Sequence, residues 1–104
     1  MASSKAYLDF ILEQLSPLDG VTYRAMMGEY ILYIRDKIFG GVYDDRLLVK
    51  PVKAAIAYMP DAGYERPYEG AKEMLLVDNV DDSGYLCGLI EAMAPELPEK
   101  KKKR

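Results

Sequence analysis

The stretch that decides the fold is Tyr23–Pro51, which reads YRAMMGEYILYIRDKIFGGVYDDRLLVKP. Its middle part, Glu29–Arg35, alternates between two sets of mostly apolar side chains. β-branched and aromatic residues with a period of two are typical of a strand on a half-buried surface, so we predict a strand here. One set would be Tyr30, Leu32 and Ile34, and the other would be Ile31, Tyr33 and Arg35.

Two more strands follow at short intervals. Turns at Asp36-Lys37 and Asp44-Asp45 would lead into Ile38–Tyr43 and Arg46–Lys50, because Asp accepts local backbone hydrogen bonds and tolerates turn geometry. The proline that follows cannot donate to a ladder, so the last strand should stop there. Connections of this length join antiparallel neighbours. The prediction is an antiparallel meander, preceded by a fourth strand over residues 22–27.

Helical patterns flank this meander. Before it, apolar residues recur on one helix face and stop at Ser16-Pro17, since the residue before proline avoids the helical region. After it we predict a short helix at Val52–Met59, a strand at Glu73–Asp78 in the same sheet, and a last helix capped by Asp81 or Asp82. Residues 1–97 would therefore form one two-layer α+β domain, ordered α-β-β-β-β-α-β-α, with the helices on one face of the sheet.

One series of residues in the central stretch is specific enough to compare with known families. It consists of Arg24, Met26-Met27-Gly28-Glu29-Tyr30, Tyr33, Gly40-Gly41, Asp44 and Leu47-Leu48-Val49-Lys50. This order resembles the N-terminal domain of the TfoX/Sxy family of competence regulators, although many relatives have Phe where this chain has Met27. The likeness extends from the first helix to about Met93.

The resemblance implies a fold similar to the secretion chaperones. It also implies regulation of DNA-uptake genes together with the cyclic-AMP receptor protein. The family supplies no active-site residues that could be transferred to this chain. Full-length family regulators have a second, C-terminal domain, so we expect these 104 residues to act as a stand-alone N-terminal domain.

Composition favours a cytoplasmic protein. A chain of 104 residues is long enough to bury a core without disulfides, and a single cysteine fits a reducing compartment. No apolar run approaches the ~18 residues of a membrane span. The N-terminus lacks the apolar segment of a signal peptide. We therefore expect a single cytoplasmic domain that does not enter a membrane.

Charge is placed unevenly along the chain. The C-terminal residues Lys100, Lys101, Lys102, Lys103 and Arg104 supply five of the fourteen basic residues. The rest has nine basic against seventeen acidic residues, a net charge of −8. An acidic body repels phosphate, whereas a basic tail could bind nucleic acid weakly and without sequence preference. We prefer to interpret residues 98–104 as a disordered, solvated end.

The segment Pro60–Lys72 is long enough to raise a functional question. Its residues Tyr64, Arg66 and Tyr68 could contact a partner protein. Both tyrosines could instead lie over the sheet as a lid on the core, since Tyr is often half-buried. We prefer the lid.

Basic residues near the predicted strand ends form a second candidate site. Arg24, Arg46 and Lys50, with Lys53 and Lys72 nearby, could converge on an anion or on a partner. The alternative is ordinary surface pairing with the abundant Asp and Glu residues, which adds little stability. We prefer the alternative.

Little in the sequence indicates catalysis or metal binding. The absence of histidine removes imidazole chemistry and the commonest metal ligand. Cys87, beside an apolar stripe, is interpreted as a small buried hydrophobe rather than a reactive thiol. Asn79–Gly84 resembles a calcium loop, but Ile90 replaces its bidentate Glu. Gly40-Gly41 matches no phosphate loop and more often marks a bulge or a close helix contact. No cofactor is expected.

We therefore expect a non-enzymatic regulatory or adaptor module that acts through contacts with a protein partner. Direct, weak nucleic-acid binding through the C-terminal tail is the alternative. An enzyme that uses carboxylates and tyrosines around residues 60–72 is a third hypothesis. Sheet edges pair readily with peptides or with a second copy, so a homodimer through an edge strand or an exposed sheet face is a further expectation.

Overall fold

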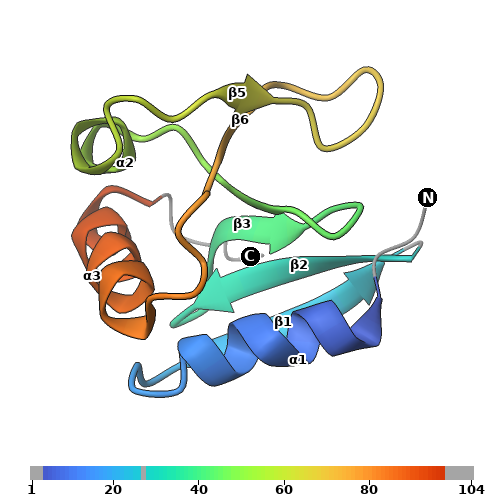
Figure 1. Cartoon of the computed structure of the whole chain (residues 1–104), viewed down its shortest axis with the longest axis horizontal. Helices are drawn as coiled ribbons and strands as arrows, with labels where there is room; N and C mark the ends of the chain where they lie inside the picture. The colour runs from blue at the N-terminus through green and yellow to red at the C-terminus, as the bar shows by residue number, and fades with distance from the viewer. Residues whose placement is uncertain (1–3, 27, 98–104) are drawn as a thin grey trace, which may run out of the picture.

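The computed structural model describes residues 4–26 and 28–97. The predicted basic tail, residues 98–104, therefore lies outside the described residues. Figure 1 shows α1 in front of β1 and β2, with α2 and α3 together at one side. In chain order the elements are α1 (Lys5–Gln14), β1 (Val21–Met26), β2 (Glu29–Ile34), β3 (Lys37–Val42), β4 (Leu47–Val49), α2 (Lys53–Tyr58), β5 (Tyr64–Glu65), β6 (Met74–Leu76), α3 (Ser83–Met93) and the 3-10 helix η1 (Ala94–Glu96).

The strands form one antiparallel sheet in the order β1-β2-β3-β4-β6-β5. The predicted meander is confirmed, because β1, β2, β3 and β4 lie side by side in the sheet in their order along the chain. The strand predicted over residues 73–78 also joins this sheet, beside β4. The two-residue strand β5, inside the long loop, was not predicted, because two residues between turn-forming residues are too few to show an alternating pattern.

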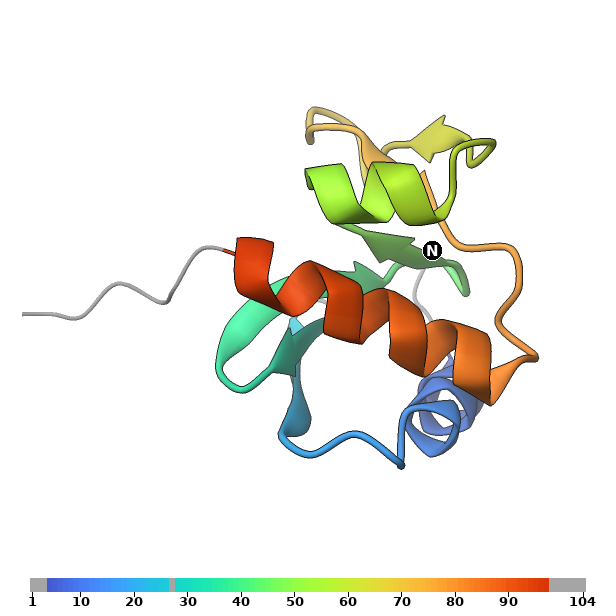
Figure 2. The same ribbon diagram turned by 90° about the vertical axis from the view of Figure 1, so that its left-hand side faces the viewer.

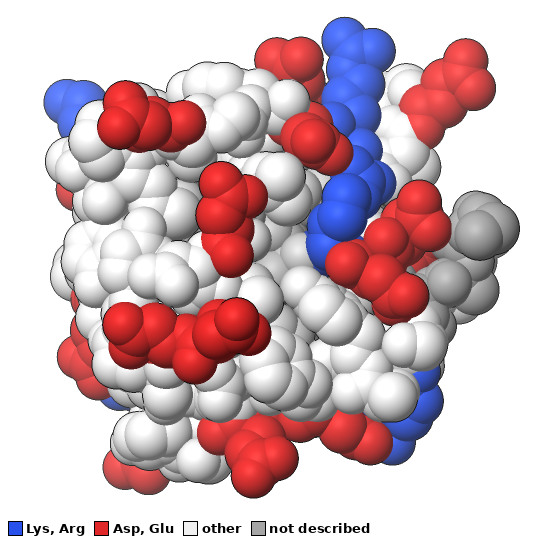
Figure 3. All heavy atoms as spheres, viewed as in Figure 1, with Lys and Arg blue, Asp and Glu red and all other residues white. Residues whose placement is uncertain are grey.

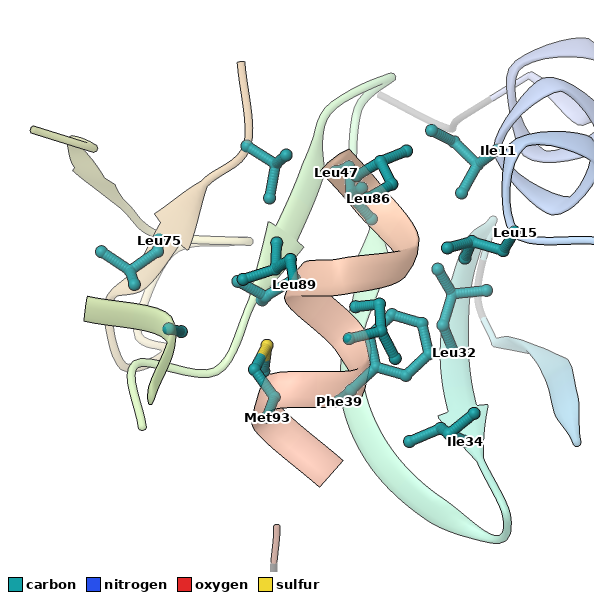
Figure 4. Close-up of a cluster of buried hydrophobic side chains, with 14 of the residues drawn as sticks. Ile11, Leu15, Leu32, Ile34, Phe39, Leu47, Leu75, Leu86, Leu89 and Met93 are labelled. Carbon is teal, nitrogen blue, oxygen red and sulfur yellow. The ribbon is translucent and has the colours of Figure 1, made fainter. Parts of the chain in front are cut away.

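All three helices cover the same face of the sheet (Figure 2), which confirms the two-layer α+β prediction. Leu32 and Ile34 of β2 belong to one buried cluster with residues from every helix. Phe39 of β3 is fully buried in it, beneath α3 (Figure 4). The helices and the residues that directly follow α1 and α2 contribute Leu8, Ile11, Leu15, Ala55, Met59, Leu86, Leu89, Ile90 and Met93.

Side-chain caps fix where the longer helices begin. The Ser4 hydroxyl accepts a hydrogen bond from the Tyr7 N–H at 3.1 Å, and a carboxylate oxygen of Asp82 accepts one from the Tyr85 N–H at 3.1 Å. Each cap satisfies a backbone donor that has no partner inside its helix. Of the two predicted caps for α3, Asp82 is therefore the one used.

Two-residue loops set the register of the meander. Arg35 and Asp36 join β2 to β3 with φ of 48° and 69°. After β3, the backbones of Tyr43 and Arg46 exchange two hydrogen bonds, and Asp44 and Asp45 form the loop between them with φ of 55° and 57°. Positive φ at both loop residues matches the twist of the paired strands. The predicted turn at Asp36-Lys37 is thus wrong by one residue, because Lys37 already belongs to β3.

Two adjacent glycines in β3 are required by close contacts. A Cβ atom on Gly40 would lie 2.1 Å from the Leu48 carbonyl oxygen of β4. A Cβ atom on Gly41 would lie 2.6 Å from the Tyr30 carbonyl oxygen and 2.7 Å from the Tyr43 ring. Side chains cannot occupy these positions without moving backbone. The close contacts are with strands and a ring, not with a helix as the sequence had suggested.

The bulge predicted near the glycine pair is present. Leu32 pairs with Gly40, and Tyr33 pairs with Ile38, so Phe39 has no direct partner on β2. The extra residue bends the strand locally and increases its twist. Phe39 therefore enters the core at a position that strict alternation would not give it.

We expect Gly40→Ala to destabilise the fold by at least about 2 kcal/mol, since its new methyl group would meet the backbone of β4. Gly63→Ala is the matched control, because nothing lies within 4 Å of its Cβ position. This control should stay within about 0.5 kcal/mol of the parent chain. Urea unfolding measures both, and equal losses would contradict the packing described at Gly40.

Candidate functional site

The second face of the sheet lies away from the helices. Ile31 and Tyr33 point to it because they alternate with the core residues of β2. Leu48 is fully buried yet stands outside the helix-side cluster, so it belongs to this face as well. We call this surface the open face and define it by Arg24, Ile31, Tyr33, Gly41, Tyr43 and Leu48.

The segment 64–68 is fixed to one end of the open face by Arg46. The Arg46 side chain forms an ion pair with Glu65, and its Nη2 donates to the Arg66 carbonyl oxygen at 3.4 Å. Its Nε donates to the Tyr43 carbonyl oxygen at 3.1 Å. The Tyr68 ring centroid lies 6.3 Å from that of Tyr43. One guanidinium thus joins the β3–β4 turn to the segment after β5.

Burial divides this region into an inner and an outer part. Tyr43 is 7% exposed. Pro67, the residue directly before Tyr68, is also buried. Tyr68 is 57% exposed, and Arg66 is exposed. The inner residues support the outer ones. We call the outer part the Tyr68 surface and define it by Arg66 and Tyr68.

Burial raises the pKa of the Tyr43 phenol, and it is the main cause of the shift. Negative charge on Tyr68, Glu29 and Tyr33 raises the same pKa further. These neighbours come from β2 and from the segment after β5. The phenol is neutral at physiological pH.

The structure brings only some of the predicted contact residues together. Arg46, Arg66 and Tyr68 are neighbours, as described above. Arg24 lies on β1, three strands away from β4, which is roughly 14 Å at normal strand spacing. Lys50 follows the opposite end of β4 from Arg46. The convergence of Arg24, Arg46 and Lys50 on one anion, the less favoured of the two interpretations, is therefore not formed.

The preferred lid interpretation of the loop tyrosines is wrong. Tyr64 is 50% exposed and pairs with Leu75, so its side chain lies on the helix side of the sheet. Tyr68 contacts Tyr43 on the other side. The two tyrosines therefore occupy different faces, and neither closes over the main core.

The sequence did not identify Tyr43 as a site residue or Tyr33 as one of its neighbours on the open face. The period of two had placed Tyr33 on the face opposite to Leu32, so a signal for Tyr33 was present. Tyr43 had no such signal. Its ring is positioned by the empty space over Gly41 and by Tyr68, and both contacts depend on the folded backbone.

Other candidate sites are shallow or structural. A hollow of about 590 Å³ lies between the end of α1 and β1, and one of about 200 Å³ lies beside Tyr58 and Tyr85. In residues 4–26 and 28–97 no group of three or more Cys, Asp or Glu side chains could hold a metal ion, and no helix is both long and apolar enough to cross a bilayer. Cys87 is half-buried, with Sγ 3.5 Å from the Gln14 carbonyl oxygen.

The raised pKa predicts that Tyr43 lowers stability in alkali. In the folded state the phenol loses its proton above the value of 10.0 that applies when it is unfolded. Its stabilising contribution is therefore complete below pH 10 and is lost as pH rises through the folded pKa. Tyr43→Phe cannot ionise, so its free energy of unfolding should fall less steeply above pH 10. Urea unfolding from pH 8 to about 11 measures both chains. If their free energies of unfolding changed with pH in parallel, the Tyr43 phenol would not be shielded from water.

Comparison with known proteins supports the resemblance noted in the sequence. A family model described as the TfoX N-terminal domain matches residues 13–86, which include the whole sheet and the Tyr68 surface. The chain is also similar to an uncharacterized 12.7 kDa protein in the trpE 5' region of Spirochaeta aurantia. The two are 31% identical over 105 residues, which cover 100% of this chain and 91% of the relative. No solved structure matches significantly. The chain therefore belongs to the TfoX N-terminal domain family.

Proposed function

We propose that this protein is a non-enzymatic regulatory module that acts in the cytoplasm by binding a protein partner through the Tyr68 surface. The observation that supports this most directly is the pairing of an exposed Tyr68 with a buried, rigid support at Tyr43. Family membership supports a regulatory role of the competence or transcription type.

The chemistry of the Tyr68 surface suits protein recognition. Tyrosine and arginine are enriched among the residues that contribute most to binding energy at protein interfaces. A tyrosine ring gives a large contact area and loses little conformational entropy, and here Tyr43 already limits its motion. Arg66 is exposed beside it, and its backbone carbonyl is held by Arg46. The surface needs little rearrangement to bind.

Charge makes nucleic acid the weaker candidate. Figure 3 shows acidic side chains spread over the face that includes α1, with basic side chains in a few places. Up to residue 99 the net charge is −8. Phosphate backbones would be repelled by such a body, and the basic residues 100–104 would have to supply the attraction. Direct, weak nucleic-acid binding through this tail remains the alternative function.

Capture of partners from an extract of the source cells tests the proposal. The double variant Arg66→Ala, Tyr68→Ala should lose the proteins that the parent chain retains, because the exposed anchors are removed while Tyr43 stays in place. The matched control is Lys53→Ala, Tyr64→Ala, which removes one exposed cation and one exposed tyrosine on the helix side. Identical sets of captured proteins for all three chains would contradict the proposed surface.

The alternative function, nucleic-acid binding, is tested by measuring the fluorescence anisotropy of labelled DNA and RNA in the presence of the protein. The full chain is compared with a version that ends at Pro98, at low and at physiological salt. We expect weak binding that disappears with the tail and with added salt. Tight binding that survives truncation would instead assign nucleic-acid recognition to the folded body.

A further inference from the structure

β1 is the long outer edge of the sheet. It has six residues, whereas the other edge strand, β5, has two. Its burial pattern shows five exposed residues after Val21, and Tyr23 and Met26 are 42% and 41% exposed. Half of the backbone N–H and C=O groups of such a strand point away from the sheet, where they can bind a further strand.

The hydrogen-bond phase identifies which groups point outward. The Arg35 N–H donates to the Gly20 carbonyl oxygen at 2.8 Å, so these two residues are a hydrogen-bonded pair. The register continues without a break from Val21 to Met26 along β2. Because bonded and non-bonded pairs alternate, Val21, Tyr23 and Ala25 direct their N–H and C=O groups away from β2.

This edge lacks the features that usually prevent pairing. Natural sheets protect long edges with proline, lysine or bulges. Val21–Met26 contains no proline or lysine, its only charged residue is Arg24, and its pairing with β2 has no register shift. No acidic residue occurs between Gly20 and Met26, although the body as a whole is strongly acidic. Two copies of this chain could therefore approach here with little repulsion.

We propose that β1 pairs antiparallel with β1 of a second copy, about a twofold axis at Tyr23. This axis pairs the outward groups of Val21, Tyr23 and Ala25 with those of Ala25, Tyr23 and Val21 of the second copy, so every outward group is satisfied. Thr22 then lies opposite Arg24 of the second copy, and no like charges are directly opposed.

The side chains at the axis have room on the helix side. The hollow of about 590 Å³ next to β1 is lined by Leu12, Leu18, Val21 and Tyr23, among others. The ring of the second copy's Tyr23 would lie beside this apolar lining. Burial of aromatic surface there would add to the backbone hydrogen bonds.

The dimer has a consequence for the proposed function, although it does not depend on it. A twofold axis perpendicular to the sheet keeps both open faces on the same side of one continuous sheet. Two Tyr68 surfaces would then face one partner or two linked sites. Such a pair can bind far more tightly than either surface alone.

Sedimentation equilibrium of the purified full chain tests the dimer. The parent chain should show a dimer that tightens as salt is added, because salt screens the repulsion between the acidic bodies. Ala25→Pro should give a monomer, since proline removes an outward N–H while the pairing with β2 is kept. A monomer mass at every concentration, for the parent chain, would overturn the proposal.

Two substitutions of opposite charge at the same position test the register of the proposed β1–β1 pairing. Thr22→Glu should tighten the dimer roughly two- to thirtyfold, because the new carboxylate meets Arg24 of the second copy twice by symmetry. Thr22→Lys should weaken it by a similar factor. Both residues have similarly low strand propensity, and urea unfolding checks that both variants fold alike. A dimer insensitive to Ala25→Pro, or one that responds equally to Glu and Lys, would overturn the proposed pairing. Because no extract is used, this failure is distinct from failure of partner capture.

Discussion

The close approach of β4 to β3 at Gly40 is the constraint on which both faces of the sheet depend. With no side chain at Gly40, the Leu48 carbonyl lies where a Cβ atom would otherwise stand. This approach lets Leu47 and Val49 enter the core beneath the helices. The neighbouring Gly41 leaves space on the opposite side, and the Tyr43 ring fills it. Two adjacent glycines thus serve two different packing layers.

The two faces of the sheet differ in how far they are buried. The helix-side face is buried by all three helices and supplies most of the stability through apolar contacts. On the open face Tyr43 and Leu48 are buried, the Arg46 side chain donates to the Tyr43 carbonyl oxygen, and Tyr68 is exposed. An acidic exterior keeps copies apart in most orientations. The β1 edge, which has no acidic residue, and the Tyr68 surface are therefore the places where a contact meets the least electrostatic repulsion.

Local patterns predicted the fold better than the site. The meander, the helices and their shared face were predicted from alternation in residues 29–35, paired aspartates at a turn and apolar helical stripes. Each of these patterns depends only on residues that are close together in the sequence. They failed where the outcome depended on distant partners. The turn shifted because Arg35 adopts positive φ, which its residue type does not favour. Tyr64 and Tyr68 looked equivalent in sequence, and only the pairing of β5 with β6 separates their faces.

Hydroxyl-radical footprinting, read by mass spectrometry, tests the central claim that the Tyr68 surface is the part of this module that binds a partner. The chain is exposed to radicals in buffer and in clarified extract of its source cells. We predict that Tyr68 loses reactivity in the extract, while Tyr64 and Phe10, exposed on the helix side, keep theirs. Protection of Tyr64 and Phe10 with no change at Tyr68 would contradict the account and move the contact surface to the helix layer.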